Sequence, residues 1–274
     1  MINLFNYIDR RSPIHELTGA TKLVCLILWM AAAMMTYDTR LLVALSVFSL
    51  ILFKVSRIKL KDVSFLIGLT LVFLVLNNVL IYLFSPNHGT EIYGTKTVLF
   101  GSGRYAVTSE QLFYHLNLLL KYLATIPFVI LFVSTTNPSE FAASLNRIGV
   151  PYTVAYSVAL ALRYIPDIQK EYHDISQAQQ ARGIEMSKKE SIGKRLKAAS
   201  AILVPLILSS MDRIEIISNA MELRGFGKNK KRTWYMAKAF TKSDYISMAV
   251  CGLLLAAAIG LNIINGGRFF NPFV

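Results

Sequence analysis

Long apolar runs alternate with short cationic stretches along this chain, and this alternation constrains the fold more than any other feature. The first three runs cover residues 23–37, 41–53 and 63–84, and four cations lie between the second and third, within residues 54–61. Only 16% of the 274 residues are charged, whereas a soluble domain carries about 25%. Because lysine and arginine gather between the apolar runs, the sequence predicts a protein that crosses a membrane several times.

Five segments are expected to cross the bilayer as helices. Counted with their flanking residues, they cover 18–37, 39–55, 63–84, 112–134 and 246–265. The apolar cores of the first two are shorter than the roughly 20 residues of a spanning helix. We therefore expect a helical hairpin there, with the Lys22 and Lys54 side chains extending toward water. The sequence thus predicts an all-α integral membrane protein with about five transmembrane helices.

Polar residues interrupt two of these segments. Asn77 and Asn78 lie deep in the third segment, where hydrogen bonding between helices is the favoured interpretation and a place in a substrate path is the alternative. In the fourth segment, Lys121 is expected to snorkel or to pair inside the complex, and Pro127 to kink the helix.

The net charge of +13 is distributed so that it orients the chain in the membrane. A basic excess can also indicate binding to nucleic acid or to anionic lipid. Here the cations flank apolar segments, which favours cytoplasmic loops. The largest basic block covers residues 137–242, and the cluster at 54–61 is expected on the same side. Residues 85–110 are rich in glycine and aromatic residues and are expected outside, as a loop or hairpin.

Three parts of the chain follow from this pattern. They are membrane helices over residues 1–136, a cytoplasmic domain over 137–242, and a last membrane helix with a tail over 243–274. Five crossings from an N-terminus inside place the C-terminus outside.

The residue types that carry catalysis or bind metals do not cluster in this sequence. The four histidines are scattered, at His15, His88, His115 and His173. The pair His15-Glu16 lacks the second histidine of a zinc-binding helix, and residues 101–103 lack the strand, helix and later glycine of a phosphate loop. Cys25 and Cys251 lie inside apolar runs and do not indicate a disulfide framework. We therefore expect no enzyme activity, no ATP site, no cofactor and no metal site.

The basic block is expected to contain one short and two long helices. The short helix begins within residues 137–140, where Asn or Ser caps it, and ends at 149–151, a Gly-Val-Pro exit. The long helices run from about 152 to 182 and from about 193 to 224, roughly 45 Å each. Their first halves are apolar and their second halves amphipathic. Pro166 and Pro205 are expected to bend them.

The two long helices end in nearly the same way, as SQAQQARGI at residues 176–184 and SNAMELRGF at 218–226. At an offset of 42 residues, the matches are Ser176 with Ser218, Ala178 with Ala220, Arg182 with Arg224, Gly183 with Gly225, and Lys188-Lys189 with Lys230-Lys231. A glycine after a cation in the last turn is a common helix ending. Two such endings, each after a long helix whose first half is apolar, favour a pair of helix tips with the same role.

These residues resemble those of the transmembrane T component of energy-coupling factor (ECF) transporters, the CbiQ-like family. That family carries two signatures of Ala-Arg-Gly type at the ends of long cytoplasmic coupling helices. Residues 181–183 match the signature outright, whereas residues 223–225 read Leu-Arg-Gly. Further stretches are similar to the family as well, at residues 12–15 with Lys22, 136–151 and 163–166. The resemblance therefore covers most of the chain.

The resemblance implies a multi-pass plasma-membrane protein that couples ATP hydrolysis to transport. Two ABC-type ATPases would bind the coupling-helix tips, and a separate membrane protein, the S component, would bind a vitamin or another micronutrient. The candidate ATPase-docking residues are Ala181, Arg182, Gly183, Leu223, Arg224 and Gly225. Arginine offers a fork of donors to carboxylates, and small neighbours permit close approach. The difference between Ala181 and Leu223 fits two non-identical ATPases.

Other functions compete with this interpretation. The permease subunit of a conventional ABC importer would itself form the substrate path, but such subunits present one short coupling loop to each ATPase, whereas this chain offers two long arms. An integral membrane enzyme is disfavoured, because no nucleophile–base pair or carboxylate cluster lies at helical spacing inside the membrane segments. The two arginines could also merely cap and solvate their helices.

Overall fold

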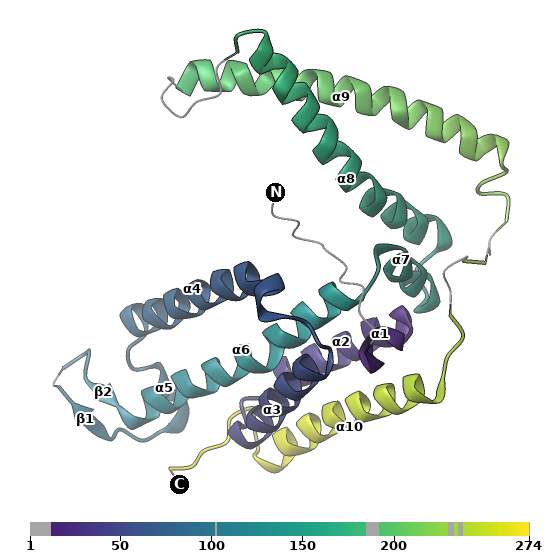
Figure 1. Ribbon diagram of the computed structural model, residues 1–274. Coiled ribbons are helices and arrows are strands. Elements are labelled where there is room, and N and C mark those ends of the chain that lie inside the picture. The colour runs from purple at the N-terminus through teal and green to yellow at the C-terminus, as the bar shows by residue number, and fades with distance from the viewer. Residues whose placement is uncertain (1–11, 102, 185–191, 230–232, 235–237, 274) are drawn as a thin grey trace. The chain divides into compact units, whose positions relative to one another are not determined.

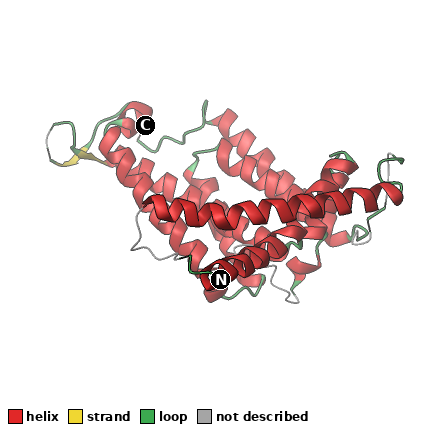
Figure 2. Cartoon of the chain, turned by 90° about the horizontal axis from the view of Figure 1, so that it is seen from above, coloured by secondary structure: helices red, strands yellow, loops and turns green. Residues whose placement is uncertain are grey.

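The computed structural model describes residues 12–101, 103–184, 192–229, 233–234 and 238–273, and its regular elements are almost all helices (Figure 2). The described residues contain one small two-stranded sheet. The chain forms two compact units, one of Met1–Ser144 with Ala237–Val274 and the other of Leu145–Met236. The predicted all-α class is confirmed.

The first unit contains the apolar helices and their connections. Its elements are α1 (Pro13–Glu16), α2 (Gly19–Met35), α3 (Thr39–Val55), α4 (Leu60–Phe84), α5 (His88–Tyr93), β1 (Val98–Phe100), β2 (Val107–Thr108), α6 (Ser109–Thr135) and α10 (Lys242–Ile264). The second unit contains the long helices α8 (Tyr152–Ala181) and α9 (Ile192–Leu223), and α7 (Pro138–Arg147) straddles the boundary. Each expected helix is present, close to its predicted limits.

Helix α6 is the central helix of the first unit, because α2, α3 and α4 pack against it, while α10 packs against α2 (Figure 1). The core between these helices centres on Trp29, which is fully buried. The Trp29 ring stacks on Phe128 with 4.5 Å between centroids, and its indole N–H donates a hydrogen bond of 2.9 Å to the carbonyl oxygen of Ala124. By contrast, α4 buries only Val63 and exposes apolar side chains along most of its length.

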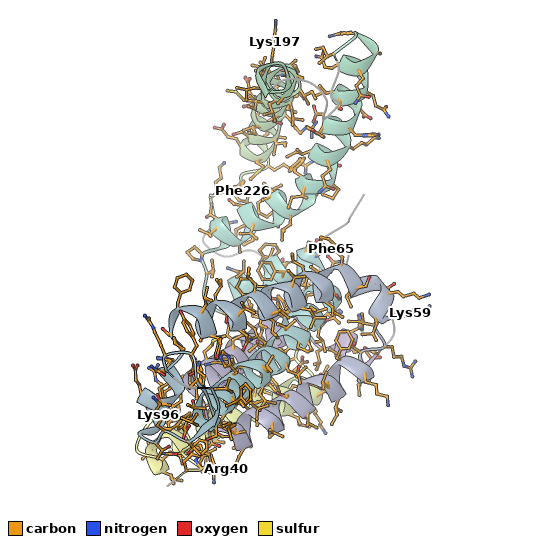
Figure 3. The ribbon with its side chains drawn as sticks, turned by 90° about the vertical axis from the view of Figure 1, so that its left-hand side faces the viewer. Arg40, Lys59, Phe65, Lys96, Lys197 and Phe226 are labelled. Atoms are coloured by element: carbon orange, nitrogen blue, oxygen red, sulfur yellow. The ribbon has the colours of Figure 1, made fainter. Side chains whose placement is uncertain are left out.

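The long helices of this unit alternate in direction, as in a chain that crosses a membrane repeatedly. The backbone N–H of Tyr37 donates to the carbonyl oxygen of Arg268 at 2.7 Å, which joins the end of α2 to the residues after α10. Figure 3 shows Arg40 and Lys96 at this same end of the first unit and Lys59, just before α4, at the opposite end. The two connections predicted to lie on opposite sides of the membrane are therefore at opposite ends of the bundle.

Three helices among the described residues, α4, α6 and α10, are long and apolar enough to cross a membrane, with mean hydropathies of 2.3, 2.0 and 2.2. Helices α2 and α3 have 17 residues each, which is short for a full crossing. The protein is therefore an all-α membrane protein, and the expected total of about five crossings depends on α2 and α3.

Two lysines within these helices are buried rather than exposed. The prediction that Lys22 extends toward water is wrong, since its ammonium donates to the carbonyl oxygens of Thr135 at 2.8 Å and His15 at 3.3 Å. The last carbonyls of α6 have no partner within their helix, so they attract a cation. Lys121 pairs inside the protein, as predicted, with the Met34 carbonyl oxygen at 3.1 Å and the Tyr37 ring at 3.7 Å.

The connection between α4 and α6 is more regular than expected, because α5 precedes its hairpin. Gly89 allows α5 to touch α6, since a Cβ there would lie 2.7 Å from the Gln111 backbone. The Gly89 N–H donates to the Gln111 amide oxygen at 2.7 Å. One turn later, His115 lies 3.1 Å from the Gln111 amide nitrogen and 2.8 Å from the Asn78 amide oxygen. Hydrogen bonding between helices, predicted near Asn78, is confirmed.

The first unit extends past residue 136 because the start of α7 packs on α2. A Cβ on Gly19 would lie 2.6 Å from the Ser144 hydroxyl oxygen and 3.0 Å from the Glu140 carbonyl oxygen. The Glu140 carboxylate in turn forms an ion pair of 2.6 Å with Lys238. Gly19 is therefore the residue that permits close contact between these two helices.

A buried aspartate joins the starts of α2 and α10. Asp244 completes a capping box with Thr241, whose N–H and hydroxyl each donate to its carboxylate at 2.7 Å. Its other oxygen accepts a hydrogen bond of 2.9 Å from the backbone N–H of Thr18, which caps α2. Asp244 is fully buried, and its carboxylate accepts hydrogen bonds at the starts of both helices.

The substitution Asp244→Ala is expected to lower the free energy of unfolding by about 2–4 kcal/mol, because it leaves the buried Thr18 N–H and the capping N–H of Thr241 without an acceptor. The melting temperature of the purified protein in detergent, followed by tryptophan fluorescence, measures this loss. Asp244→Asn keeps one acceptor oxygen and should lose less. Equal melting temperatures for the three proteins would show that this junction does not stabilise the bundle.

Candidate functional site: the α8–α9 helix pair

Helices α8 and α9 pack against each other as an antiparallel pair. Successive contacts along α8 are Tyr156 with Phe226, Glu171 with Arg213, and Gln179 with Ala201. As the chain advances along α8, its partner therefore moves back along α9. Both helices continue through Pro166 and Pro205 as single elements, and the predicted bends stay a prediction.

The α8 helix ends in a Schellman turn. The N–H of Gly183 donates to the carbonyl oxygen of Gln180 at 3.0 Å, and the N–H of Ile184 donates to that of Gln179 at 3.1 Å. Gly183 has φ +86°, a left-handed conformation that glycine adopts without steric cost. Arg182 is the C-cap residue within this turn, directly before Gly183, and its side chain is exposed.

The α9 helix ends in the same way. The N–H of Gly225 donates to the carbonyl oxygen of Glu222 at 2.8 Å, and the N–H of Phe226 donates to that of Met221 at 2.9 Å. Gly225 has φ +65°, and Arg224 before it is exposed. The sequence repeat therefore folds into two copies of one backbone turn, each of which presents an arginine.

The centre of the pair is a polar contact that sequence reasoning missed. The Glu171 carboxylate accepts hydrogen bonds from the Arg213 guanidinium, at 2.6 Å, and from the Ser209 hydroxyl. Arg213 follows Glu171 by 42 residues, the offset of the repeat, so residues at equivalent positions meet here. A signal was present, because opposite charges occupy equivalent positions of the two helices.

This central contact lies equally far from the two helix ends. Arg182 follows Glu171 by eleven residues, and Arg224 follows Arg213 by eleven. At 1.5 Å per residue, each arginine is about 16 Å along its helix from the contact. Since the helices are antiparallel, the two arginines lie on opposite sides of it.

The second helix end is held by an aromatic cluster, which we define as Tyr152, Tyr156, Phe226 and Trp234. Phe226 lies 4.8 Å from Tyr156 and 5.9 Å from Tyr152 between ring centroids, and Trp234 lies 5.3 Å from Tyr152. The Trp234 indole N–H also donates to the Asn146 amide oxygen at 3.1 Å. The counterpart of Phe226 in the repeat is Ile184, so the aromatic residue belongs to one copy only.

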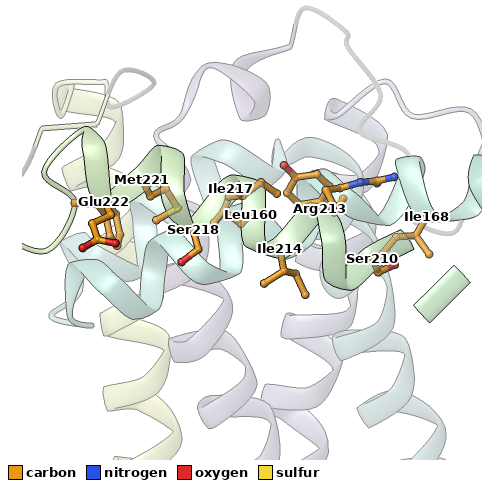
Figure 4. A pocket seen from close by; sticks show the side chains of 11 residues that line it. Leu160, Ile168, Ser210, Arg213, Ile214, Ile217, Ser218, Met221 and Glu222 are labelled. Carbon is orange, nitrogen blue, oxygen red and sulfur yellow. The ribbon is translucent and has the colours of Figure 1, made fainter. Parts of the chain in front are cut away.

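An apolar groove of about 540 Å³ runs between the two helices (Figure 4). It is lined by Leu160, Tyr164, Ile168, Ser210, Arg213, Ile214, Ile217, Ser218, Met221, Glu222 and Phe226. Besides Ile214 in the groove, α9 exposes a series of large apolar side chains, namely Leu203, Val204, Ile207, Leu208, Met211 and Ile216. An exposed apolar surface of this kind marks an interaction site.

The six candidate docking residues fall into two separate groups at opposite ends of the helix pair. Ala181, Arg182 and Gly183 are exposed at the end of α8, and Leu223 at the end of α9 is 90% exposed. Within the second group, Gly225 is half-buried. The paired lysines of the repeat, at 188–189 and 230–231, lie outside the described residues.

Proteins similar to this chain are transporter components. The CbiQ family, described as cobalt transport protein, matches residues 10–235. An energy-coupling factor transporter transmembrane protein, EcfT, of Bacillus selenitireducens is 30% identical over 269 residues, or 95% of this chain and 97% of the relative. EcfT of Leuconostoc gelidum subsp. gasicomitatum is 32% identical over 72% of this chain and 75% of its own length. EcfT of Bacillus subtilis is 26% identical over 92% of this chain and 95% of its own length.

Proposed function

Since the chain belongs to the CbiQ family and is a transmembrane component of the energy-coupling factor transporter type, we propose that it couples ATP hydrolysis by two ABC-type ATPases to micronutrient uptake. A separate membrane S component binds the transported vitamin or other micronutrient. The chain itself is a transporter membrane subunit rather than an enzyme. The observation that carries the proposal is the pair of equivalent arginine-bearing turns on one antiparallel helix pair.

One ATPase docks at each of these helix ends. Arg182 and Arg224 are exposed and follow the last turn of a long helix, where a planar guanidinium reaches a carboxylate on a partner surface. The positive-φ glycine that follows each arginine turns the chain away and leaves the helix end accessible. When the ATPases close on ATP, their docking grooves move and carry the two helix ends with them.

The S component packs on apolar surface that the chain leaves exposed. The exposed apolar side chains on α9 and the groove between α8 and α9 are more favourable in contact with another membrane protein than exposed to water. Motion of the helix ends about the Glu171–Arg213 contact changes the shape of this surface. ATP hydrolysis thereby changes how the S component is held.

In this proposal the chain crosses the plasma membrane five times, through α2, α3, α4, α6 and α10, with residues 137–242 in the cytoplasm. The alternating directions of these helices support the topology. The cations of residues 54–61 then lie on the cytoplasmic side, as the positive-inside rule requires.

Affinity purification of the full-length chain in mild detergent, followed by mass spectrometry of its partners, tests the proposal. We expect two ABC ATPases and one small substrate-binding membrane protein in near-stoichiometric amounts. The competing function, a permease subunit of a conventional ABC importer, predicts ATPases and a second permease without an S component. Recovery of that complex would reject the coupling role.

A further inference from the structure

An exposed apolar hairpin stands at the end of α4. Strands β1 and β2 pair antiparallel, with Val98 opposite Thr108 and Phe100 opposite Val107. All three residues of β1 are exposed, and Phe100 is 80% exposed. Figure 2 shows the two strands beyond the packed helices. Apolar side chains exposed on both faces of a strand are unfavourable in water and favour aggregation.

Hydrogen bonds tie the base of this hairpin to the start of α6. The fully buried carboxylate of Glu110, in the first turn of α6, accepts hydrogen bonds from the Thr97 N–H at 3.0 Å and from the Thr95 hydroxyl at 3.0 Å. The Ser109 N–H donates to the Thr97 carbonyl oxygen at 3.1 Å. The residues directly before the exposed strand β1 are therefore fixed to α6.

A tyrosine pair ties the hairpin to the last turns of α4. The Tyr82 hydroxyl donates to the carbonyl oxygen of Tyr105 at 2.7 Å, and the Tyr105 hydroxyl donates to that of Leu83 at 3.5 Å. Helix α4 is one of the three helices able to cross a membrane, and its last residue, Phe84, is 72% exposed. The hairpin thus lies at the depth where a membrane helix leaves the hydrocarbon.

Charge on the hairpin fits a phospholipid surface. Exposed Lys96 and Arg104 flank the apolar strand, and the sequence from Thr95 to Ser109 contains no acidic residue. Cations beside apolar and aromatic side chains are the composition of an interfacial anchor, in which the apolar groups enter the acyl boundary and the cations meet phosphate.

We propose that Val98, Leu99 and Phe100 form a membrane-interface anchor that inserts into the headgroup region of the leaflet where α4 ends. The anchor fixes the depth of α4 in the bilayer. This inference rests on α4 crossing the membrane and not on the identity of the subunits that bind the chain. A protein partner covering the same strand is the competing occupant.

Depth-dependent fluorescence quenching tests the anchor on the full chain in nanodiscs of phosphatidylcholine and phosphatidylglycerol. A bimane label is attached to Phe100→Cys, and Lys96→Cys on the same hairpin is the matched control. Cys25 and Cys251 are buried, and labelling of the unaltered chain measures their contribution. We expect lipid with a nitroxide at acyl carbon 5 to quench the label at position 100 at least about twofold, and aqueous iodide to quench it less than the label at 96.

Either of two results would overturn the anchor. One is strong iodide quenching at position 100 without lipid quenching, which places the strand in water. The other is loss of lipid quenching once the assembled transporter is reconstituted, which assigns the strand to a protein partner. The same measurement leaves ATPase docking untested, so failure of the anchor and failure of the coupling role are distinguishable.

Discussion

Charge reversal at both helix ends, Arg182→Glu with Arg224→Glu, is expected to abolish uptake and to reduce recovery of the ATPases at least about tenfold. Loss of one charged partner from a close interface pair costs about 2–5 kcal/mol, and about 1.4 kcal/mol already changes affinity tenfold. Both arginines are exposed and do not line the core. The measurements are ATPase co-purification and substrate uptake by reconstituted vesicles.

Matched controls separate docking from general charge effects. Lys170→Glu on α8 and Lys59→Glu just before α4 make the same charge change at exposed positions away from the candidate docking ends of α8 and α9 (Figure 3). They should leave ATPase recovery near the unaltered level. If the arginine variants and these controls behaved alike, the docking role would have to be abandoned.

Breaking the central contact is expected to uncouple hydrolysis from transport. With Glu171→Ala or Arg213→Ala, we expect uptake per ATP hydrolysed to fall roughly fivefold while the ATPases still bind. The contact fixes how the two helices cross, so without it motion of one end is transmitted poorly to the other. The pair is partly exposed, with side-chain exposures of 19% for Glu171 and 34% for Arg213, so we expect a coupling energy of only about 1 kcal/mol.

A charge exchange provides the decisive comparison for this contact. Glu171→Arg combined with Arg213→Glu restores an ion pair at the same place and should recover at least about half of the lost coupling. Asp212→Ala, an exposed neighbour on α9, is the control and should have no effect. A double variant no better than the single ones would show that the ion pair does not link the helix ends.

Much of the fold could be predicted from the sequence because its signals are local. The sequence predicts the membrane helices from their apolar runs, α8 and α9 from apolar runs that continue as amphipathic segments, and α7 from a polar cap and a Gly-Val-Pro exit. The candidate site was found by internal comparison, since the residues that form a Schellman turn are adjacent in the chain. Whether those turns bind ATPases stays a prediction.

The remaining features depend on residues far apart in the chain. The sequence predicts that Lys22 extends toward water, yet its ammonium donates a hydrogen bond to the carbonyl oxygen of Thr135, 113 residues later. The Asp244 carboxylate accepts a hydrogen bond from the backbone N–H of Thr18, which lies 226 residues earlier. Single-residue patterns carry no information on which helix covers which, so these buried partners could not be inferred.

By itself, the sequence determined the membrane class, the helices, the repeated helix endings and, through those endings, the family. These properties follow from apolar periodicity, caps and turns within a few residues of each other. Only the tertiary structure decided that α8 and α9 run antiparallel and that Glu171 meets Arg213 midway between the two arginines. That outcome depends on side-chain packing and charge between two separate helices, which no local pattern specifies.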